Sequence, residues 1–270
     1  MYEFDRSTPV TVVLRAHGGA VEIVAEERLT AQVDVQPMSA GGTDAAQNTR
    51  VVLEDDTLLV QAPGAEAWSW RRSPKLRITV RVPLGSSVAG KTAADVRARG
   101  VFGDVRLESA SGDVDLAEAT GDVALEAASG DLTVGRVGGS LRAKSSSGDL
   151  HIGDVTHDVN AETASGNIRT GAIDGSARAY TASGDIEIGS LRQGKAEVRS
   201  ASGDITVGVA AGSAVWMDVN TSSGKSITDL TARGDVPPSD TPAELELRIR
   251  TASGDIRIHR APSARPAAAA

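Results

Sequence analysis

A short motif, Ser-Gly-Asp, recurs through the middle of the chain at a fixed interval. Five copies stand 18 residues apart, with Asn in place of Asp in the fourth copy: Ser111, Ser129, Ser147, Ser165 and Ser183. The interval then lengthens to 19 residues at Ser202, 21 residues at Ser223 and 30 residues at Ser253. A fixed period of this kind is typical of folds in which one structural unit stacks on the next.

Each 18-residue unit divides into two nine-residue halves, and each half contains a short alternation of apolar and polar residues. Val105 and Leu107 belong to one half, and Val114 and Leu116 belong to the next. Alternation with a period of two indicates a β-strand with one buried face. Strands this short are stabilised by stacking on neighbouring coils. The sequence therefore predicts an all-β fold, a single-stranded β-solenoid (β-helix) with 18-residue coils of two nine-residue halves.

An 18-residue coil would also fit a three-sided helix built from six-residue units. Glycine, however, recurs after nine residues, at Gly103, Gly112 and Gly121. We therefore expect two sheets, with one strand of each coil in each sheet.

The Ser-Gly-Asp motif is predicted to form the corner between the two halves of a coil. The residue before the motif is always Ala or Ser, which fits a tight turn. Glycine adopts positive φ without penalty, and Asp or Asn can bond to nearby backbone amides. We therefore expect a structural ladder of corner residues: Gly112, Asp113, Gly130, Asp131, Gly148, Asp149, Gly166, Asn167, Gly184, Asp185, Gly203 and Asp204.

Two chemical roles for this ladder compete with the structural one. Stacked carboxylates about 5 Å apart repel each other, so a cation between them would help. Calcium prefers six to eight oxygen ligands, whereas each half supplies at most one Asp. The repeated serines lack a partner His that could act as a base. We expect no metal site, no cofactor and no catalytic residue, so the chain is predicted not to be an enzyme.

The outward-facing positions carry charges of both signs. One column contains Arg106, Ala124, Arg142, Asn160, Arg178 and Glu197. Interspersed charges are typical of a solvent-exposed face. The formal net charge of −8 argues against a nucleic-acid partner.

The two ends of the chain depart from the repeat. Residues 1–85 contain six apolar alternations and are predicted to form an N-terminal β cap region: Val10–Arg15, Ala20–Val24, Ala31–Val35, Arg50–Leu53, Leu58–Gln61 and Leu76–Val82. Residues 86–260 are predicted to form the solenoid, with a proline-containing loop insertion at about 231–243. Glu244–Thr251 is predicted to be a strand, and Ile256 and Ile258 are expected to close the stack. Residues 261–270 are predicted to be a disordered tail.

Trp68, Trp70, Arg71 and Arg72 form an aromatic and basic cluster between Gly64 and Pro74. Such a composition is typical of protein-binding hot spots, and Trp is also favoured at membrane surfaces. The alternative is that the indole rings close the core of the cap. We expect a protein partner at this cluster and at the outer faces of the coils, with peripheral membrane contact and self-association through the terminal coils as further alternatives.

The N-terminus has acidic residues where a signal peptide carries basic ones, and no apolar stretch is long enough to span a membrane. The chain contains no cysteine, which rules out a lipobox, a disulfide and a thiol nucleophile. We therefore expect a cytoplasmic location.

The serial Ser-Ala-Ser-Gly-Asp-Val/Ile motif resembles the bacterial putative-adhesin family, also called the toast-rack domain. Three N-terminal stretches are similar to it as well: Gly18–Ile23, Asp56–Val60 and Leu76–Pro83. The resemblance implies a β-strand-repeat domain of unknown function, with relatives associated with cell-envelope stress or surface attachment. It supplies no catalytic residues. We therefore expect a non-catalytic β-solenoid scaffold or interaction protein, with a surface adhesin and a carbohydrate-active β-helix enzyme as alternatives.

Overall fold

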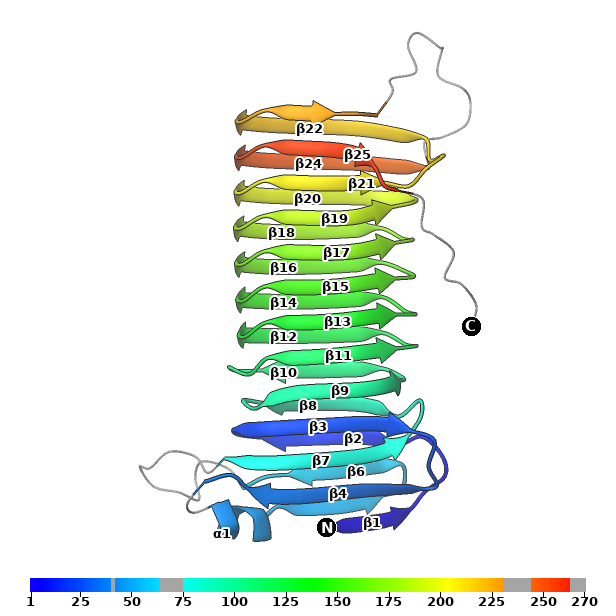
Figure 1. The fold of residues 1–270 in the computed structure, drawn as a ribbon, viewed down its shortest axis with the longest axis vertical. Coiled ribbons are helices and arrows are strands. Elements are labelled where there is room, and N and C mark those ends of the chain that lie inside the picture. The colour runs from blue at the N-terminus through cyan, green and yellow to red at the C-terminus, as the bar shows by residue number, and fades with distance from the viewer. Residues whose placement is uncertain (40–41, 64–74, 231–243, 263–270) are drawn as a thin grey trace.

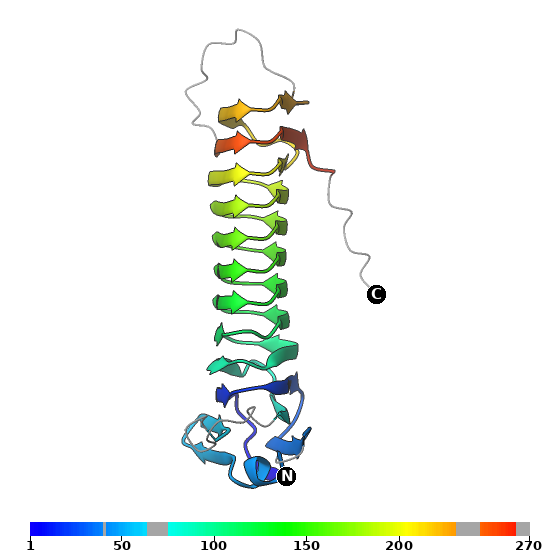
Figure 2. The same ribbon diagram turned by 90° about the vertical axis from the view of Figure 1, so that its left-hand side faces the viewer.

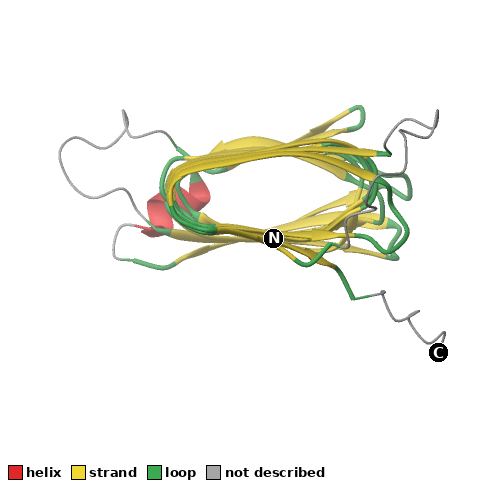
Figure 3. Ribbon diagram, turned by 90° about the horizontal axis from the view of Figure 1, so that it is seen from above, coloured by secondary structure: helices red, strands yellow, loops and turns green. Residues whose placement is uncertain are grey.

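Two long β-sheets face each other along the molecule (Figure 1, Figure 3). The computed structural model describes residues 1–39, 42–63, 75–230 and 244–262. Within these residues, one short helix, α1 (Gly42–Gln47), lies near the N-terminal end of the stack. No helix in the described part of the chain is long and apolar enough to cross a membrane.

The described strands form two sheets, in which the spatial order of the strands departs from their sequence order at both ends. From one end to the other, sheet A contains β1 (Tyr2–Asp5), β4 (Thr30–Pro37), β7 (Leu76–Pro83), β3 (Gly19–Glu26), β9 (Asp95–Phe102), β11 (Val114–Ala119), β13 (Leu132–Val137), β15 (Leu150–Val155), β17 (Ile168–Ile173), β19 (Ile186–Leu191), β21 (Ile205–Val209), β25 (Ile256–Arg260) and β23 (Ser226–Thr228). Sheet B contains β22 (Val215–Ser223), β24 (Leu245–Ser253), β20 (Gly194–Ser202), β18 (Ala177–Ser183), β16 (Val159–Ser165), β14 (Leu141–Ser147), β12 (Val123–Ser129), β10 (Val105–Ser109), β8 (Ser87–Thr92), β2 (Thr11–Ala16), β6 (Thr57–Gln61) and β5 (Arg50–Glu54).

The central coils stack in the order of the sequence. From β8 to β21, each coil gives one strand to sheet B and the next strand to sheet A, and neighbouring coils pair in parallel (Figure 1, Figure 2). Leu132 pairs with Leu150, and Leu150 with Ile168, so the 18-residue period sets the register. The predicted β-solenoid with two sheets per coil is confirmed.

The core consists of aliphatic columns between the two sheets. Leu132, Leu150 and Ile168 stack along sheet A and are fully buried. Across from them, the sheet B column passes from Leu141 through Val159 to the smaller side chain of Ala177. Burial of such columns provides the main stabilisation, and it depends on neighbouring coils covering each other.

The six strands expected in residues 1–85 are present as β2 to β7, each within two residues of the expected limits. β2 and β3 form a coil that pairs in parallel with β8 and β9. β6 and β7 form the next coil outward, while β1, β4 and β5 pair antiparallel at the end of the stack. Both sheets are therefore hydrogen bonded without interruption across residue 85, the predicted boundary of the cap. β1 and α1 were not predicted from the sequence.

The prediction that Ile256 and Ile258 close the stack is wrong. β24 lies between β20 and β22, and β25 lies between β21 and β23, so the coil formed by β22 and β23 is outermost. The reason is burial. Leu245, Leu247 and Ile249 of β24 are fully buried, whereas every residue of β23 is exposed. The more apolar coil therefore takes the inner position. The predicted loop at 231–243 and residues 263–270 of the predicted tail lie outside the described residues.

Candidate functional site

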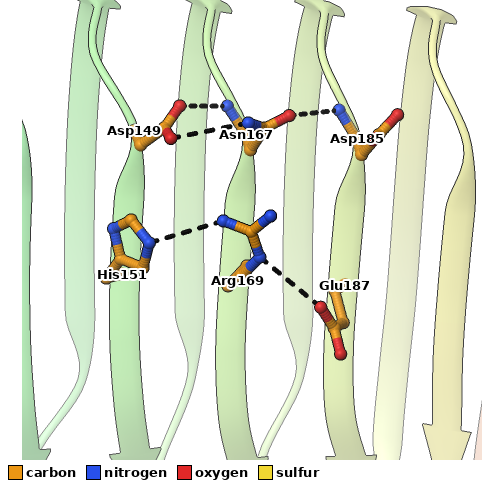
Figure 4. A network of polar contacts seen from close by, with 6 residues as sticks. All are labelled: Asp149, His151, Asn167, Arg169, Asp185 and Glu187. Carbon is orange, nitrogen blue, oxygen red and sulfur yellow. Dashed lines mark hydrogen bonds and ion pairs between the residues drawn. The ribbon is translucent and has the colours of Figure 1, made fainter.

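The predicted corner residues lie along one edge of sheet A, where its strands begin. Figure 4 shows three of them, Asp149, Asn167 and Asp185. The Asp149 Oδ1 atom accepts a hydrogen bond of 2.8 Å from the Asn167 backbone amide, and Asn167 Oδ1 accepts one of 2.9 Å from the Asp185 amide. These bonds join one coil to the next, whereas an Asx-turn would bond within its own coil. The corner side chains therefore connect coils.

The same contact continues along the whole corner edge at donor–acceptor distances of 2.8 to 3.2 Å. The backbone amide of each following residue donates to the side chain of the one before it: Asp95, Asp113, Asp131, Asp149, Asn167, Asp185, Asp204, Asp255 and, as the last donor, Lys225. One oxygen of each acceptor is thus occupied by the backbone. Among the described residues, no group of three His, Cys, Asp or Glu side chains could hold a metal ion.

Close stacking of the coils explains the glycine of the motif. Gly148 has a φ of 151°, and a Cβ atom there would lie 2.1 Å from the carbonyl oxygen of Gly130. Gly112 has no positive φ, yet a Cβ atom there would lie 2.2 Å from the Ala94 carbonyl oxygen. The requirement for glycine at both corners therefore follows from the adjacent backbone.

A second row of hydrogen bonds, which was not predicted from the sequence, lies inside the same corner. Thr163, Thr181 and Ser200 are buried, and each hydroxyl donates to the carbonyl oxygen of a corner glycine at 3.1 to 3.3 Å. The signal in the sequence is a Ser or Thr two residues before Ser-Gly in these coils. These hydroxyls have a structural role, since each joins its coil to the corner of the coil before it.

A long groove runs over the outer face of sheet B, across the coils. We call it the axial groove. It has a volume of about 1010 Å³ and extends from β8 to β24. At about 4.8 Å per strand, this is a length of about 35 Å. Two outward columns line it. The first contains Asp104, Asp122, Ser140, Asp158 and Ser176, and the second contains Arg106, Ala124, Arg142, Asn160 and Arg178.

The floor of the axial groove is backbone. Val105, Val123 and Leu141 lie between the two columns, and their side chains are buried in the core. Asp104 and Asp122 use one carboxylate oxygen each to accept a backbone amide of the next coil, at 2.9 and 2.8 Å. The groove is therefore flat along its floor, and its sides are held in register by the stack.

Arginines recur at every second coil of the second column. Arg106, Arg142 and Arg178 are separated by Ala124 and Asn160 in the strand register. Two coils correspond to about 10 Å. Arg178 contacts Glu197 at 3.7 Å, whereas Arg106 and Arg142 form no ion pair with any described residue. On the outer face of sheet A, by contrast, Arg169 contacts both Glu187 and His151 (Figure 4).

Asn160 lies at the centre of the axial groove, between Arg142 and Arg178. Its Oδ1 atom is buried and has no hydrogen-bond partner among the described residues. Asn160 and the charge of Arg142 both help to lower the pKa of the Glu162 carboxyl. The main cause of the lowered pKa of Glu162 is its hydrogen bond to Lys144, at 2.5 Å. Asn160 thus places a polar amide at the centre of the groove, with its oxygen covered by neighbouring atoms.

The predicted partner site, Trp68, Trp70, Arg71 and Arg72, lies outside the described residues and stays a prediction. The sequence predicts the second column as a solvated outer face of the coils and names the outer faces as contact surfaces, but it does not predict the first column or the groove. The available signal was the pair of polar residues on either side of the first apolar residue of each sheet B strand, such as Asp104 and Arg106.

A family model described as Toastrack DUF4097 matches residues 11–259. Three solved structures share the arrangement, each with 95% of both chains covered. A "putative adhesin" from Bacteroides fragilis has 14% identity and a TM-score of 0.44. A "putative lipid binding protein" and a "putative adhesin" from Parabacteroides distasonis have 16% and 10% identity, with TM-scores of 0.48 and 0.42. No curated protein has significant similarity to the chain. At these values the solved structures carry no statement about function.

Proposed function

The chain belongs to the Toastrack family, and from this premise we propose that it is a non-catalytic binding protein whose axial groove holds an extended acidic glycan. The observation that carries the proposal is the groove itself, with an arginine at every second coil of its second column.

The chemistry of the two columns fits a glycan. Guanidinium groups bind carboxylates, and neither Arg106 nor Arg142 forms an ion pair within 4.0 Å in the described protein, although the Arg142 charge helps to lower the pKa of Glu162. Hydroxyl groups of a sugar can donate to the second carboxylate oxygens of Asp104 and Asp158, which the backbone amides do not use. A charge on every second sugar of an extended chain matches arginines about 10 Å apart. The ligand is therefore long and carries spaced negative charges.

Hyaluronate is a suitable probe because it carries one carboxylate per disaccharide. Binding of biotinylated hyaluronate to the full chain is measured by biolayer interferometry, with dextran as the neutral probe. We expect the Arg142→Ala, Arg178→Ala double variant to bind hyaluronate at least tenfold more weakly. The matched control is the Arg97→Ala, Arg169→Ala double variant on sheet A, which removes the same charge and leaves the groove intact.

Equal loss in both double variants would show that hyaluronate responds only to net charge and would contradict the groove. If neither hyaluronate nor dextran binds, the proposal of an acidic glycan ligand is contradicted. An Asn160→Leu variant removes the polar amide at the centre of the groove, and we expect severalfold weaker binding.

The carbohydrate-active enzyme and the scaffold make different predictions. We expect the chain length of hyaluronate, measured by size-exclusion chromatography, to be unchanged after prolonged incubation with the protein. Shortening would overturn the non-catalytic part of the proposal.

A surface adhesin would use the same groove for attachment, whereas a scaffold would bind a protein through it. Competition of hyaluronate with a captured protein partner would favour the scaffold.

A further inference from the structure

The outermost strand of sheet B, β22, has an open edge. It pairs in parallel with β24 on one side, and no described strand pairs with its other side. β22 is nine residues long and reads Val-Trp-Met-Asp-Val-Asn-Thr-Ser-Ser. Natural edge strands are protected by Lys, Pro, a bulge or short length. β22 has none of these protections in its sequence or its regular pairing.

The core is also open at this end. Met217 and Val219 continue the columns of Leu247 and Ile249, which are fully buried one coil below. Met217 is 37% exposed, and Trp216 on the other face of the strand is 49% exposed. Among the described residues, no strand lies beyond this last apolar layer or pairs with the outer edge of β22.

We propose that this end binds a second copy of the chain, with β22 pairing antiparallel to β22 of that copy around a two-fold axis at Val219. A two-fold axis perpendicular to the stack superimposes sheet B on the continuation of sheet B and keeps inward side chains facing inward. It joins two solenoids at their C-terminal ends and closes the contact after two copies.

The sequence of β22 selects the register. Pairing around Val219 uses all nine residues and places Asp218 opposite Asn220 of the other copy. Pairing around Asp218 would place two carboxylates directly opposite each other, which is destabilising. Pairing around Asn220 shortens the overlap and loses Trp216. A two-fold axis placed between two neighbouring residues would set inward-facing side chains opposite outward-facing ones.

The opposite end of the stack is a poorer partner. Its sheet B edge is β5, which is five residues long and carries Arg50 and Glu54 at its ends. Its sheet A edge is β1, which carries Glu3 and Asp5. Pairing of β22 with β5 would match only part of β22 and would form open filaments. The symmetric pairing uses the whole strand.

The test uses Asn220, which is exposed and lies opposite Asp218 only in the proposed register. Asn220→Asp would set carboxylates of the two copies against each other at two places, and Asn220→Lys would create two attractive pairs. Within one chain, Asn220 has Arg250 as its neighbour in β24 and Asp218 two residues away on the same face, and these two groups contact each other at 3.6 Å. Their effects on a charge at position 220 oppose each other, so urea unfolding of both variants separates a change in folding from a change in dimerisation.

The full chain and both variants are measured by sedimentation velocity over a range of concentrations. We expect a monomer–dimer equilibrium, at least tenfold weaker in Asn220→Asp and severalfold tighter in Asn220→Lys. A wild-type chain that stays monomeric at about 100 μM, well above the Kd of an ordinary specific dimer, overturns the proposal, and so does growth beyond the dimer. Shifts of both variants in the same direction would contradict the register and thus the proposed pairing.

Discussion

Replacement of Gly148 by Ala tests whether close stacking of coils is what holds glycine at the corners. A Cβ atom at this position would lie 2.1 Å from the Gly130 carbonyl oxygen. Because that oxygen belongs to the backbone, it cannot turn aside as the end of a flexible side chain could. The φ of 151° adds strain of about 1–3 kcal/mol for a residue with a side chain. Separation of these two coils would weaken the hydrogen bonds that the Gly130 amide donates to the Ser147 carbonyl and that the Asp149 amide donates to Asp131 Oδ1. Each contributes about 1 kcal/mol.

The free energy of unfolding is therefore expected to fall by about 3–5 kcal/mol in Gly148→Ala, measured by urea unfolding with far-UV circular dichroism. Two glycines provide matched controls. Gly212 has a φ of 88° with no atom within 4 Å of its Cβ position, so Gly212→Ala should show the cost of φ alone, about 1–2 kcal/mol. Gly18 has open space and no positive φ, so Gly18→Ala should be nearly neutral. If Gly148→Ala costs no more than Gly212→Ala, the reasoning from close stacking is refuted.

Three further predictions concern the inner hydroxyls, the inserted coil and one ion pair. Thr181→Val removes a buried hydroxyl and should lower the free energy of unfolding by about 1 kcal/mol in urea; an unchanged midpoint would argue against the inner row. Leu247→Ala should cost about 2–5 kcal/mol because it empties a fully buried position, and Met217→Ala on the outermost coil should cost less; equal losses would contradict the order of the coils. The hydrogen bond from Lys144 lowers the pKa of Glu162 below its ordinary value of 4.5, so this contribution to stability is present above that pH and is lost as the pH falls through the lowered pKa. Glu162→Gln should therefore lower the free energy of unfolding by up to about 1 kcal/mol at neutral pH and leave it unchanged in strong acid. Thermal melts of both proteins across this pH range measure the difference. A difference that persists in acid would exclude the ion pair as its cause.

The fold could be predicted from the sequence because one local pattern is repeated with a constant spacing. The alternation of Val105 and Leu107 defines a strand, and the 18-residue interval defines its register in every central coil. The order of the coils at the C-terminal end could not be predicted in this way. The interval from Ser202 to Ser223 is shorter than that to Ser253, so spacing alone favours sequential stacking. Burial of Leu247 overrides the spacing, and this outcome depends on the competition between two whole coils.

The candidate site was only partly predictable. The corner residues follow from the motif, but the direction of their hydrogen bonds depends on the distance to the next coil. Asn167 takes the place of an aspartate in the ladder, because its Oδ1 atom accepts the same hydrogen bond from the next coil. The second column of the axial groove was visible as a series of outward residues. The groove itself arises from the relation of that column to Asp104 and Asp122, which no single repeat reveals.

The inserted coil at the C-terminal end has a mechanical consequence. β24 is hydrogen bonded to β20 on one side and to β22 on the other, and β25 is bonded in the same way to β21 and β23. A force that pulls on the chain beyond β25 acts first on a strand with two neighbours, so it must break two sets of hydrogen bonds at once. In a solenoid stacked in simple sequence order, the same force would peel off one edge strand at a time. The order of the last two coils therefore makes this end of the rod resistant to tension applied through the C-terminus.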